Sequence, residues 1–204
     1  MGNKFDINVY DERYYNWHKE ATANYIKSNM DWYVSKYSPK SIIDYGCGVG
    51  YYLLSAYNNG VLDLKGFDIG GENVKKFTPK CIQQYIEYCD ITKHIETKKY
   101  KLVISIETAE HLEPMGTFAY LSNLVNSMYD DGTLLFSAAP PNQSGTGHIN
   151  LHEKDWWIEQ IQKFGLFYDK SKTDFVSSMW ATQKAPYYIT NNLLIFTKEN
   201  HGKV

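Results

Sequence analysis

The sequence predicts an α/β fold: one doubly wound, mostly parallel sheet of seven strands with an antiparallel hairpin near its C-terminus. Short β-branched runs alternate with stretches of helical periodicity, which is typical of parallel strands covered by helices. A glycine-rich turn directly follows the first of these runs, where open α/β sheets bind ligands. The last two strand-like runs have no helical stretch between them, and this predicts the hairpin.

The elements are expected in a regular order. An N-terminal helix over residues 19–37 places Ile26, Met30, Tyr33, Val34 and Tyr37 on one face. Glycines end the first strand and the helix that follows it, and Asp131-Gly132 supplies the turn before the fifth strand. We expect strands over residues 41–45, 62–67, 86–89, 100–106, 133–138, 175–180 and 188–197, and further helices over residues 49–57, 72–77, 117–129 and 153–164.

Composition and charge exclude several classes of protein. The formal net charge of the 204 residues is −2, so no global basic field attracts nucleic acid. The three cysteines form no C-x-x-C pair, which indicates a reducing compartment and no thiolate zinc site. No signal peptide is recognisable, and no apolar run approaches the roughly 20 residues that cross a bilayer. We therefore expect a single-domain cytoplasmic protein without membrane contact.

Acidic residues end three successive predicted strands. Asp44 opens the turn Asp44-Tyr45-Gly46-Cys47-Gly48-Val49-Gly50, whose glycines fall at every second residue, unlike the G-x-G-x-x-G turn of nicotinamide-binding proteins. Asp68 ends the second strand, where a carboxylate can accept both ribose hydroxyls of a nucleoside, and Asp90 ends the third. Each aspartate taken alone has a second interpretation, as the cap of a helix or turn.

With these motifs the chain resembles the class I S-adenosylmethionine (SAM)-dependent methyltransferases, a Rossmann-like family, from Ser41 to Lys198. Residues 105–114 and 147–150 further resemble the small-molecule branch of the ubiquinone-biosynthesis type. The resemblance implies SAM as cofactor, S-adenosylhomocysteine as product, and a reversed last strand. It implies that SAM binds to Asp44, Gly46, Cys47, Gly48, Asp68, Ile69, Asp90, Ile91, Ile106 and Glu107.

The resemblance also implies that residues 1–40 form a helical lid over the cofactor domain of residues 41–204. Tyr14 and Tyr15 are then candidates for contact with the cofactor or the acceptor, although they can equally pack against the sheet. Trp180, close to Tyr187 and Tyr188, is a candidate wall of the acceptor pocket, and its alternative is a place in the core.

Histidines are the candidate catalytic residues. A hydroxyl acceptor must lose a proton, and histidine has a suitable pKa for removing it. His148, in a polar loop after the fifth strand, is the first candidate, with loop fixation as its alternative; His111, after the fourth strand, is the second. His152 is expected to join His148 in binding the acceptor. We expect no metal site, because His148 and His152 have helical spacing but lie in a loop.

The function expected from these features is methylation of a hydroxyl on a small molecule, such as a sugar or a glycan precursor. Aromatic residues, with 18 Tyr, suit stacking on sugar rings. A nucleic-acid methyltransferase is the second interpretation, and the chain lacks its basic appendage and an aromatic residue after Pro140-Pro141. A non-catalytic SAM-binding module and a nicotinamide oxidoreductase are the remaining alternatives.

Overall fold

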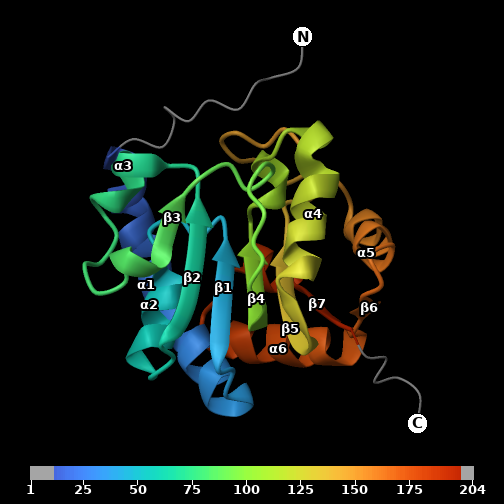
Figure 1. The fold of residues 1–204 in the computed structure, drawn as a ribbon, viewed down its shortest axis with the longest axis horizontal. Coiled ribbons are helices and arrows are strands. Elements are labelled where there is room, and N and C mark those ends of the chain that lie inside the picture. The colour runs from blue at the N-terminus through green and yellow to red at the C-terminus, as the bar shows by residue number, and fades with distance from the viewer. Residues whose placement is uncertain (1–11, 199–204) are drawn as a thin grey trace.

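The computed structural model describes the backbone of residues 12–198 and the side chains of residues 22–198. Within that range, seven strands form one sheet in the order β3-β2-β1-β4-β5-β7-β6 (Figure 1). β7 runs antiparallel to both of its neighbours, and the pairs among β1 to β5 are parallel. The strands are β1 (Ser41–Tyr45), β2 (Asp63–Asp68), β3 (Ile86–Tyr88), β4 (Tyr100–Ile106), β5 (Met128–Ser137), β6 (Phe167–Tyr168) and β7 (Leu194–Thr197).

Helices cover both faces of the sheet. Side chains of α1 (Glu12–Tyr37), α2 (Tyr51–Asn58), α6 (Lys170–Thr182) and α7 (Tyr187–Asn192) share one apolar core with the strands. Side chains of α4 (Thr117–Asn126) and α5 (Lys154–Gln162) form a second core on the opposite face. The short α3 (Gly71–Lys75) follows β2, and single turns of 3₁₀ helix, η2 (Gln83–Tyr85), η3 (Ala109–His111) and η4 (Pro114–Gly116), complete the connections.

The two-faced burial explains why the central strands are apolar at most positions. In β1, Ile42 contacts the core under α1 and α2, and the next residue, Ile43, contacts the core under α4 and α5. Leu134 and Leu135 of β5 divide between the two cores in the same way. Because successive strand side chains point to opposite faces, a strand buried on both sides reads as a nearly continuous apolar run.

The expected fold class is confirmed, but the expected hairpin strand over residues 175–180 is wrong. Those residues belong to α6, and the strand that pairs with β7 is the two-residue β6. The helix begins where the side chain of Asp169 accepts a hydrogen bond of 2.8 Å from the backbone N–H of Lys172, which is an N-cap. The predicted strand over residues 188–197 is also divided, because α7 occupies its first part.

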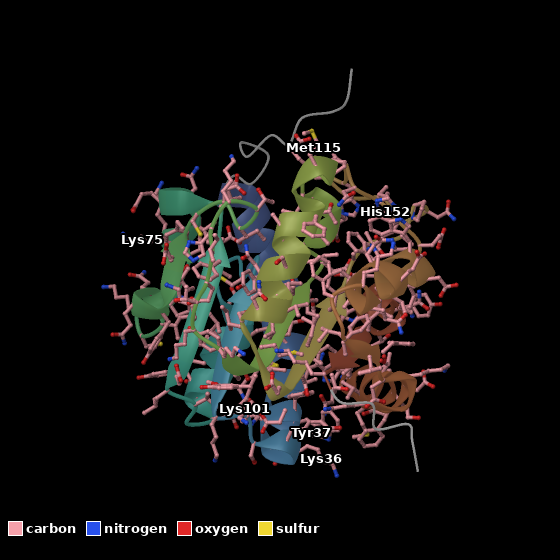
Figure 2. All side chains as sticks on the ribbon, turned by 45° about the vertical axis from the view of Figure 1, so that its right-hand side comes forward. Lys36, Tyr37, Lys75, Lys101, Met115 and His152 are labelled. Atoms are coloured by element: carbon pink, nitrogen blue, oxygen red, sulfur yellow. The ribbon has the colours of Figure 1, made fainter. Side chains whose placement is uncertain are left out.

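The strand order positions a binding crevice. β1 and β4 are neighbours, and the connections that leave their carboxyl ends run to opposite sides, which is where open α/β sheets bind ligands. Met115 and His152 lie toward that end of the molecule, whereas Tyr37 and Lys101 lie at the other (Figure 2). No helix in the described part of the chain is long and apolar enough to span a bilayer.

Candidate active site

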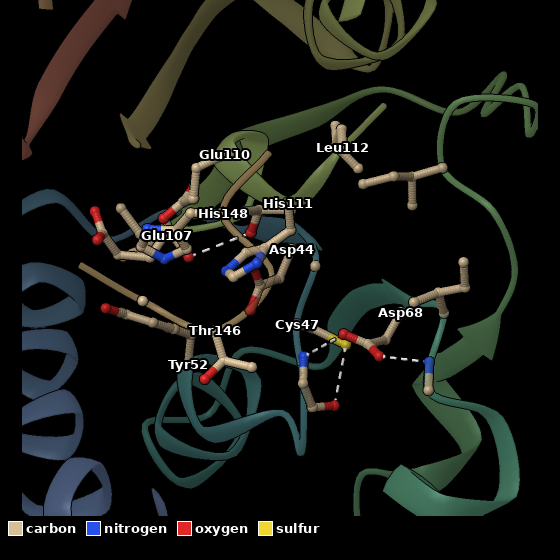
Figure 3. A pocket seen from close by; sticks show the side chains of 18 of the residues that line it. Asp44, Cys47, Tyr52, Asp68, Glu107, Glu110, His111, Leu112, Thr146 and His148 are labelled. Atoms are coloured by element: carbon tan, nitrogen blue, oxygen red, sulfur yellow. Dashed lines mark hydrogen bonds between the residues drawn. The ribbon is translucent and has the colours of Figure 1, made fainter. Parts of the chain in front are cut away.

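A cavity of about 670 Å³ lies at the carboxyl ends of β1 to β4. Its floor is the glycine turn after β1, and its sides are the segments after β2, β3 and β4. The loop of residues 143–148 and side chains from α1, α2 and α7 complete the wall. Figure 3 shows Cys47 and Asp68 on one side of this cavity and Glu107, Glu110 and His148 on the other. The cavity therefore has two chemically different parts.

The glycine turn brings the backbone to the surface of the cavity. Gly46, Gly48 and Gly50 all have positive φ, a region that glycine adopts without a steric penalty. A Cβ on Gly46 would lie 2.3 Å from Cγ2 of Thr108, so the turn is pressed against the segment after β4. A Cβ on Gly48 would have no protein atom within 4 Å. Gly48 therefore exposes its main chain to a ligand in the cavity.

Asp68 is held in a fixed orientation by main-chain donors. The N–H of Gly48 donates to Oδ2 and the N–H of Gly70 donates to Oδ1, each at 2.8 Å. Burial raises the pKa of this carboxyl, and the two N–H groups partly offset the effect. Each oxygen accepts one backbone N–H and Asp68 lines the cavity, so the second lone pair of each oxygen can accept from a ligand there.

Asp44 is the least compensated acid in this part of the cavity. It is buried, and its Oδ2 atom has no hydrogen-bond partner. Burial raises the pKa of Asp44 well above its usual range, and the charge of the nearby Asp68 adds to the effect. A buried carboxylate oxygen without a donor is costly, so the site is suited to a ligand that brings a cationic donor.

Asp90 caps the turn that follows β3, which is the alternative role that the sequence offers for each aspartate. Its Oδ1 accepts hydrogen bonds from the hydroxyl of Thr92 at 2.6 Å and from the backbone N–H of Thr92 at 3.0 Å. Its Oδ2 forms an ion pair of 2.7 Å with Lys93. Burial acts to raise the pKa of Asp90, but these partners outweigh burial and lower it. Asp90 still lines the cavity beside Ile91 and Thr92.

These features fit SAM, whose sulfonium supplies an electrophilic methyl group when the molecule is bound. The partnerless oxygen of Asp44 offers an acceptor for an ammonium group, and the fixed carboxylate of Asp68 offers acceptors for a ribose diol. The main chain of Gly48, which carries no side chain, leaves room for the part of SAM that joins its ammonium group to its ribose. The carboxylate acceptors and the glycine turn are therefore those that the cofactor requires.

Glu107 organises the second part of the cavity. It has positive φ (51°), and its carboxylate accepts hydrogen bonds from Ser137 Oγ at 2.8 Å, Gln143 Nε2 at 2.7 Å and Asn192 Nδ2 at 3.2 Å. These donors come from β5, from the loop after it and from α7. Burial raises the pKa of Glu107, and the three donors act against this shift. Glu107 thus joins three distant segments.

Glu110, His111 and His148 lie together beside Glu107 (Figure 3). The His111 and His148 rings make an edge contact with centroids 4.9 Å apart. Burial lowers the pKa of His111 to about 4, and the neighbouring His148 contributes to that shift, so His111 is neutral near pH 7. Burial raises the pKa of Glu110 well above its usual range, and Glu107 adds to the effect. This part of the cavity is rich in acids and imidazoles.

The structure brings most of the expected site residues to one cavity. All ten expected cofactor residues line it, as do His111 and His148. The prediction for Trp180 is wrong, since its side chain is 0% exposed and belongs to the core between α1 and α6. Tyr188, its neighbour in the prediction, does line the cavity.

Two other predictions have different outcomes. His152 lies outside the cavity lining: its ring stacks on Trp156 with centroids 3.5 Å apart, and Nε2 is 3.1 Å from Oδ1 of Asn150. It therefore packs against α5 instead of joining His148. The backbone of Tyr14 and Tyr15 belongs to α1, but their side chains lie outside the described residues.

Sequence reasoning assigned no role to several wall residues. Glu110 was part of the segment that carried the family resemblance, but nothing in one sequence shows that its carboxylate is buried. Tyr25 belongs to the core cluster under α1, although it is outside the helical period that predicted the buried face there. The residues without an expected role are Tyr25, Tyr52, Thr108, Glu110, Gln143 and Asn192.

Comparison with solved structures gives many matches in fold. The O-methyltransferase of a trans-AT polyketide synthase from Brevibacillus brevis, solved with S-adenosylhomocysteine, has a TM-score of 0.61 at 15% identity, over 86% of this chain and 72% of that one. A sugar N-methyltransferase from a Streptoalloteichus species has a TM-score of 0.67 at 9% identity, over 98% and 94%. Magnesium protoporphyrin IX methyltransferase from Synechocystis has a TM-score of 0.62 at 18% identity, over 85% and 82%. At these identities the likeness concerns the fold.

Sequence comparison identifies the family. Comparison with the sequences of curated proteins gives no match. Residues 19–182 match a protein family described as a methyltransferase domain, and this range includes the glycine turn, the acidic strand ends and the loop with His148. Together with the reversed strand β7 and the carboxylates that fit SAM, the match shows that the chain belongs to the class I SAM-dependent methyltransferases.

Proposed function

We propose that the enzyme transfers the methyl group of SAM to a hydroxyl of a small molecule, such as a sugar or a glycan precursor. The observation that carries the proposal is the acid- and imidazole-rich part of the cavity, which adjoins the part that fits the cofactor (Figure 3). Tyr25, Tyr52 and Tyr188 line the same cavity, and tyrosine combines an apolar ring face with a polar tip. Such walls suit a hydroxylated ring.

Each residue then has a chemical role. Asp44, Asp68 and Asp90 hold the cofactor, and Ile69 and Ile91 pack against it. Glu107 positions the acceptor side of the cavity through its three hydrogen bonds. His111 and His148 assist the loss of the hydroxyl proton. The acceptor oxygen forms a bond with the methyl carbon as the carbon–sulfur bond breaks, and the electron pair of that bond stays on sulfur.

Orientation is the main contribution of such an enzyme. Holding two reactants in line can supply roughly 7–11 kcal/mol of the barrier by removing the entropy of their encounter. The hydrogen bonds that join β4, β5 and α7 around Glu107 fix one side of the cavity before any ligand binds. A rigid wall of this kind supports positioning better than a mobile loop does.

Charge pairing weighs against nucleic acid as the acceptor. Many described lysines are paired with carboxylates, for example Lys65 with Glu87 at 2.7 Å and Lys98 with Asp63 at 2.5 Å. Paired lysines add little to the attraction of a phosphate backbone. The solved structures of similar fold include a sugar N-methyltransferase and the O-methyltransferase of a polyketide synthase, which supports an acceptor of this kind.

The test is an acceptor screen with the purified protein. Sugars, nucleotide sugars and glycan fragments are incubated with SAM, and methylated products and S-adenosylhomocysteine are measured by mass spectrometry. We expect stoichiometric formation of both with at least one hydroxylated acceptor, and a loss of transfer in His148→Ala. Transfer to DNA or RNA that falls steeply with salt, with none to any sugar, would contradict the proposal.

A further inference from the structure

Three side chains at the acceptor end of the cavity have the composition of a metal site. Glu110, His111 and His148 each offer one ligand atom, and these atoms all lie within 4.8 Å of one another. Ligands around a first-row metal lie about 2.0–2.2 Å from the ion, so small side-chain rotations bring the three atoms onto one centre. Two imidazoles and one carboxylate with open positions form a set that divalent transition metals use.

Glu110 indicates that a cation belongs there. Its side chain is 0% exposed, it lines the cavity, and neither carboxylate oxygen has a hydrogen-bond partner. A carboxylate that ionises in so buried a place needs a counter-charge, and a bound metal ion would supply one. Glu107 beside it is a second acid, whose carboxylate accepts from Ser137, Gln143 and Asn192, so it adds negative charge that a divalent ion would balance.

Both histidines are oriented as metal ligands are. Nδ1 of His111 lies 3.2 Å from the carbonyl oxygen of Gly147, and Nδ1 of His148 lies 3.2 Å from the carbonyl oxygen of Gln143. A carbonyl only accepts, so each Nδ1 donates in these contacts, and an ion would bind through Nε2. Ring N–H groups bonded to backbone carbonyls are the outer contacts that fix the tautomer of metal-binding histidines.

A second ring of contacts holds the loop that carries His148. The side chain of Gln143 donates to Glu107, and the carbonyl of the same residue accepts from His148. Asn192 of α7 donates to both Glu107 and Gln143. Gly145 packs against the His148 ring so closely that an added Cβ would lie 2.1 Å from Nε2. The ring is therefore held in place from two sides.

We propose that Glu110, His111 and His148 bind one divalent transition-metal ion that coordinates the acceptor hydroxyl. This metal site rests on the proposed function, and in it the two histidines promote loss of the hydroxyl proton as ligands of the ion. A bound divalent ion lowers the pKa of a coordinated hydroxyl, which releases its proton to water. The oxygen then attacks the methyl carbon, and the charge of Glu110 is balanced by the ion.

The first experiment measures the metal without any acceptor. Full-length protein is treated with EDTA, dialysed and titrated with Mn²⁺, and the signal of free Mn²⁺ is followed by electron paramagnetic resonance. We expect one ion per chain, with nitrogen modulation of the bound signal from imidazole ligands. Glu110→Gln should weaken binding more than the 10–100-fold typical of an outer-shell contact. Gly145→Ala, which keeps all three ligands, should weaken it by displacing the His148 ring.

A matched control comes from a second cluster in the described part of the chain. Glu87, Cys89 and His94 also offer three ligand types within 4.8 Å of one another, but Glu87 is exposed and paired with Lys65. His94→Ala should leave Mn²⁺ binding unchanged. Equal binding by wild type and Glu110→Gln, or no binding of Mn²⁺ or Zn²⁺ by wild type, overturns the proposal.

Turnover separates this proposal from the proposed function. Once an acceptor is known, EDTA should abolish methyl transfer and Mn²⁺ should restore it, while the affinity for S-adenosylhomocysteine stays unchanged. Full activity in EDTA overturns the metal site and leaves the acceptor assignment intact. Metal binding at the three residues, combined with no transfer to any hydroxyl, contradicts the proposed function and leaves the metal site intact.

Discussion

Gly46 and Gly48 lie in the same turn, but a methyl group added to each would meet different surroundings. At Gly46 it would lie 2.3 Å from Cγ2 of Thr108, within the packing between the ends of β1 and β4. At Gly48 it would project into the cavity with no protein atom within 4 Å. Both residues have positive φ, so backbone strain is common to the two positions, and the neighbouring atoms make the difference.

This difference predicts two distinct phenotypes. Gly46→Ala should destabilise the protein by roughly 2–4 kcal/mol, because strain and overpacking add. Gly48→Ala should cost only about 1–2 kcal/mol in stability, yet it should weaken S-adenosylhomocysteine binding at least about tenfold by filling the cradle. Urea unfolding and calorimetric titration measure the two effects. If Gly48→Ala binds like wild type, the ligand does not approach this main chain.

Asp68 permits a second prediction at the scale of one residue. Asp68→Ala removes the acceptor of two backbone N–H groups and of the expected ribose hydroxyls. Hydrogen bonds to a charged group contribute about 1.5–3 kcal/mol each, so S-adenosylhomocysteine binding should weaken roughly 100-fold or more. Asp63→Ala is the matched control, because Asp63 pairs with Lys98 at the opposite end of the same strand. Calorimetric titration of both variants should give a change only for Asp68→Ala.

At the scale of elements, α6 determines how the reversed strand is supported. Val176 and Trp180 of this helix are fully buried against α1 and the sheet, whereas Phe175 on the same helix is 46% exposed. Thr173 of this helix also binds the reversed strand, because its Oγ1 accepts a hydrogen bond of 2.9 Å from the N–H of Ile195 in β7. The helix is thus part of the core and does not face the acceptor.

Substitutions in α6 should therefore change stability without changing the chemistry. Trp180→Ala should cost about 3–5 kcal/mol through the cavity it leaves. Trp180→Phe should cost clearly less, because it keeps most of the ring and removes an indole N–H that has no partner. Phe175→Ala should stay within about 1 kcal/mol. The free energy of unfolding in urea orders the three variants, and a loss of methyl transfer by well-folded Trp180→Phe would contradict the core assignment.

The failure of sequence reasoning at α6 has a physical cause. Phe175-Val176-Ser177-Ser178-Met179-Trp180 contains residue types that favour strands, but Asp169 caps a helix three residues before Lys172, and the cap decides the element. β6 has two residues and therefore shows no periodicity. The central strands β1 and β4 were predictable because their nearly continuous apolar runs indicate burial on both faces. Glu110 was not recognised as a site residue, since burial of a single polar side chain depends on tertiary packing.

At the scale of the whole molecule, the cavity concentrates acids that folding leaves poorly solvated. Burial raises the pKa of Asp44, Asp68, Glu107 and Glu110, and all four line one cavity. In the unfolded chain these groups ionise near their ordinary pKa values of about 4. Above that pH the folded state binds more protons than the unfolded state, so these groups make stability fall as pH rises.

Asp44→Asn should reduce this pH dependence. Asparagine has nearly the shape of the protonated acid and cannot ionise, so the variant avoids the cost of a buried charge. Relative to wild type, its free energy of unfolding should change little near pH 4 and become increasingly favourable toward pH 8. Urea unfolding at several pH values measures the slope for each protein. Asp63→Asn, at an exposed ion pair, is the control, and an unchanged slope in Asp44→Asn would contradict the burial of an uncompensated acid.

The position of β7 also affects how the chain is made. β7 lies between β5 and β6, although residues 138–193 separate it from β5 along the sequence. During synthesis β5 therefore has an open edge until Leu194–Thr197 has left the ribosome, and β6 has no partner strand before then. Exposed strand edges recruit other chains, and long-range pairing forms slowly. We expect the last strand to complete the sheet only after its own residues have been translated. Chaperone contact and aggregation should therefore concentrate between the synthesis of β5 and its pairing with β7.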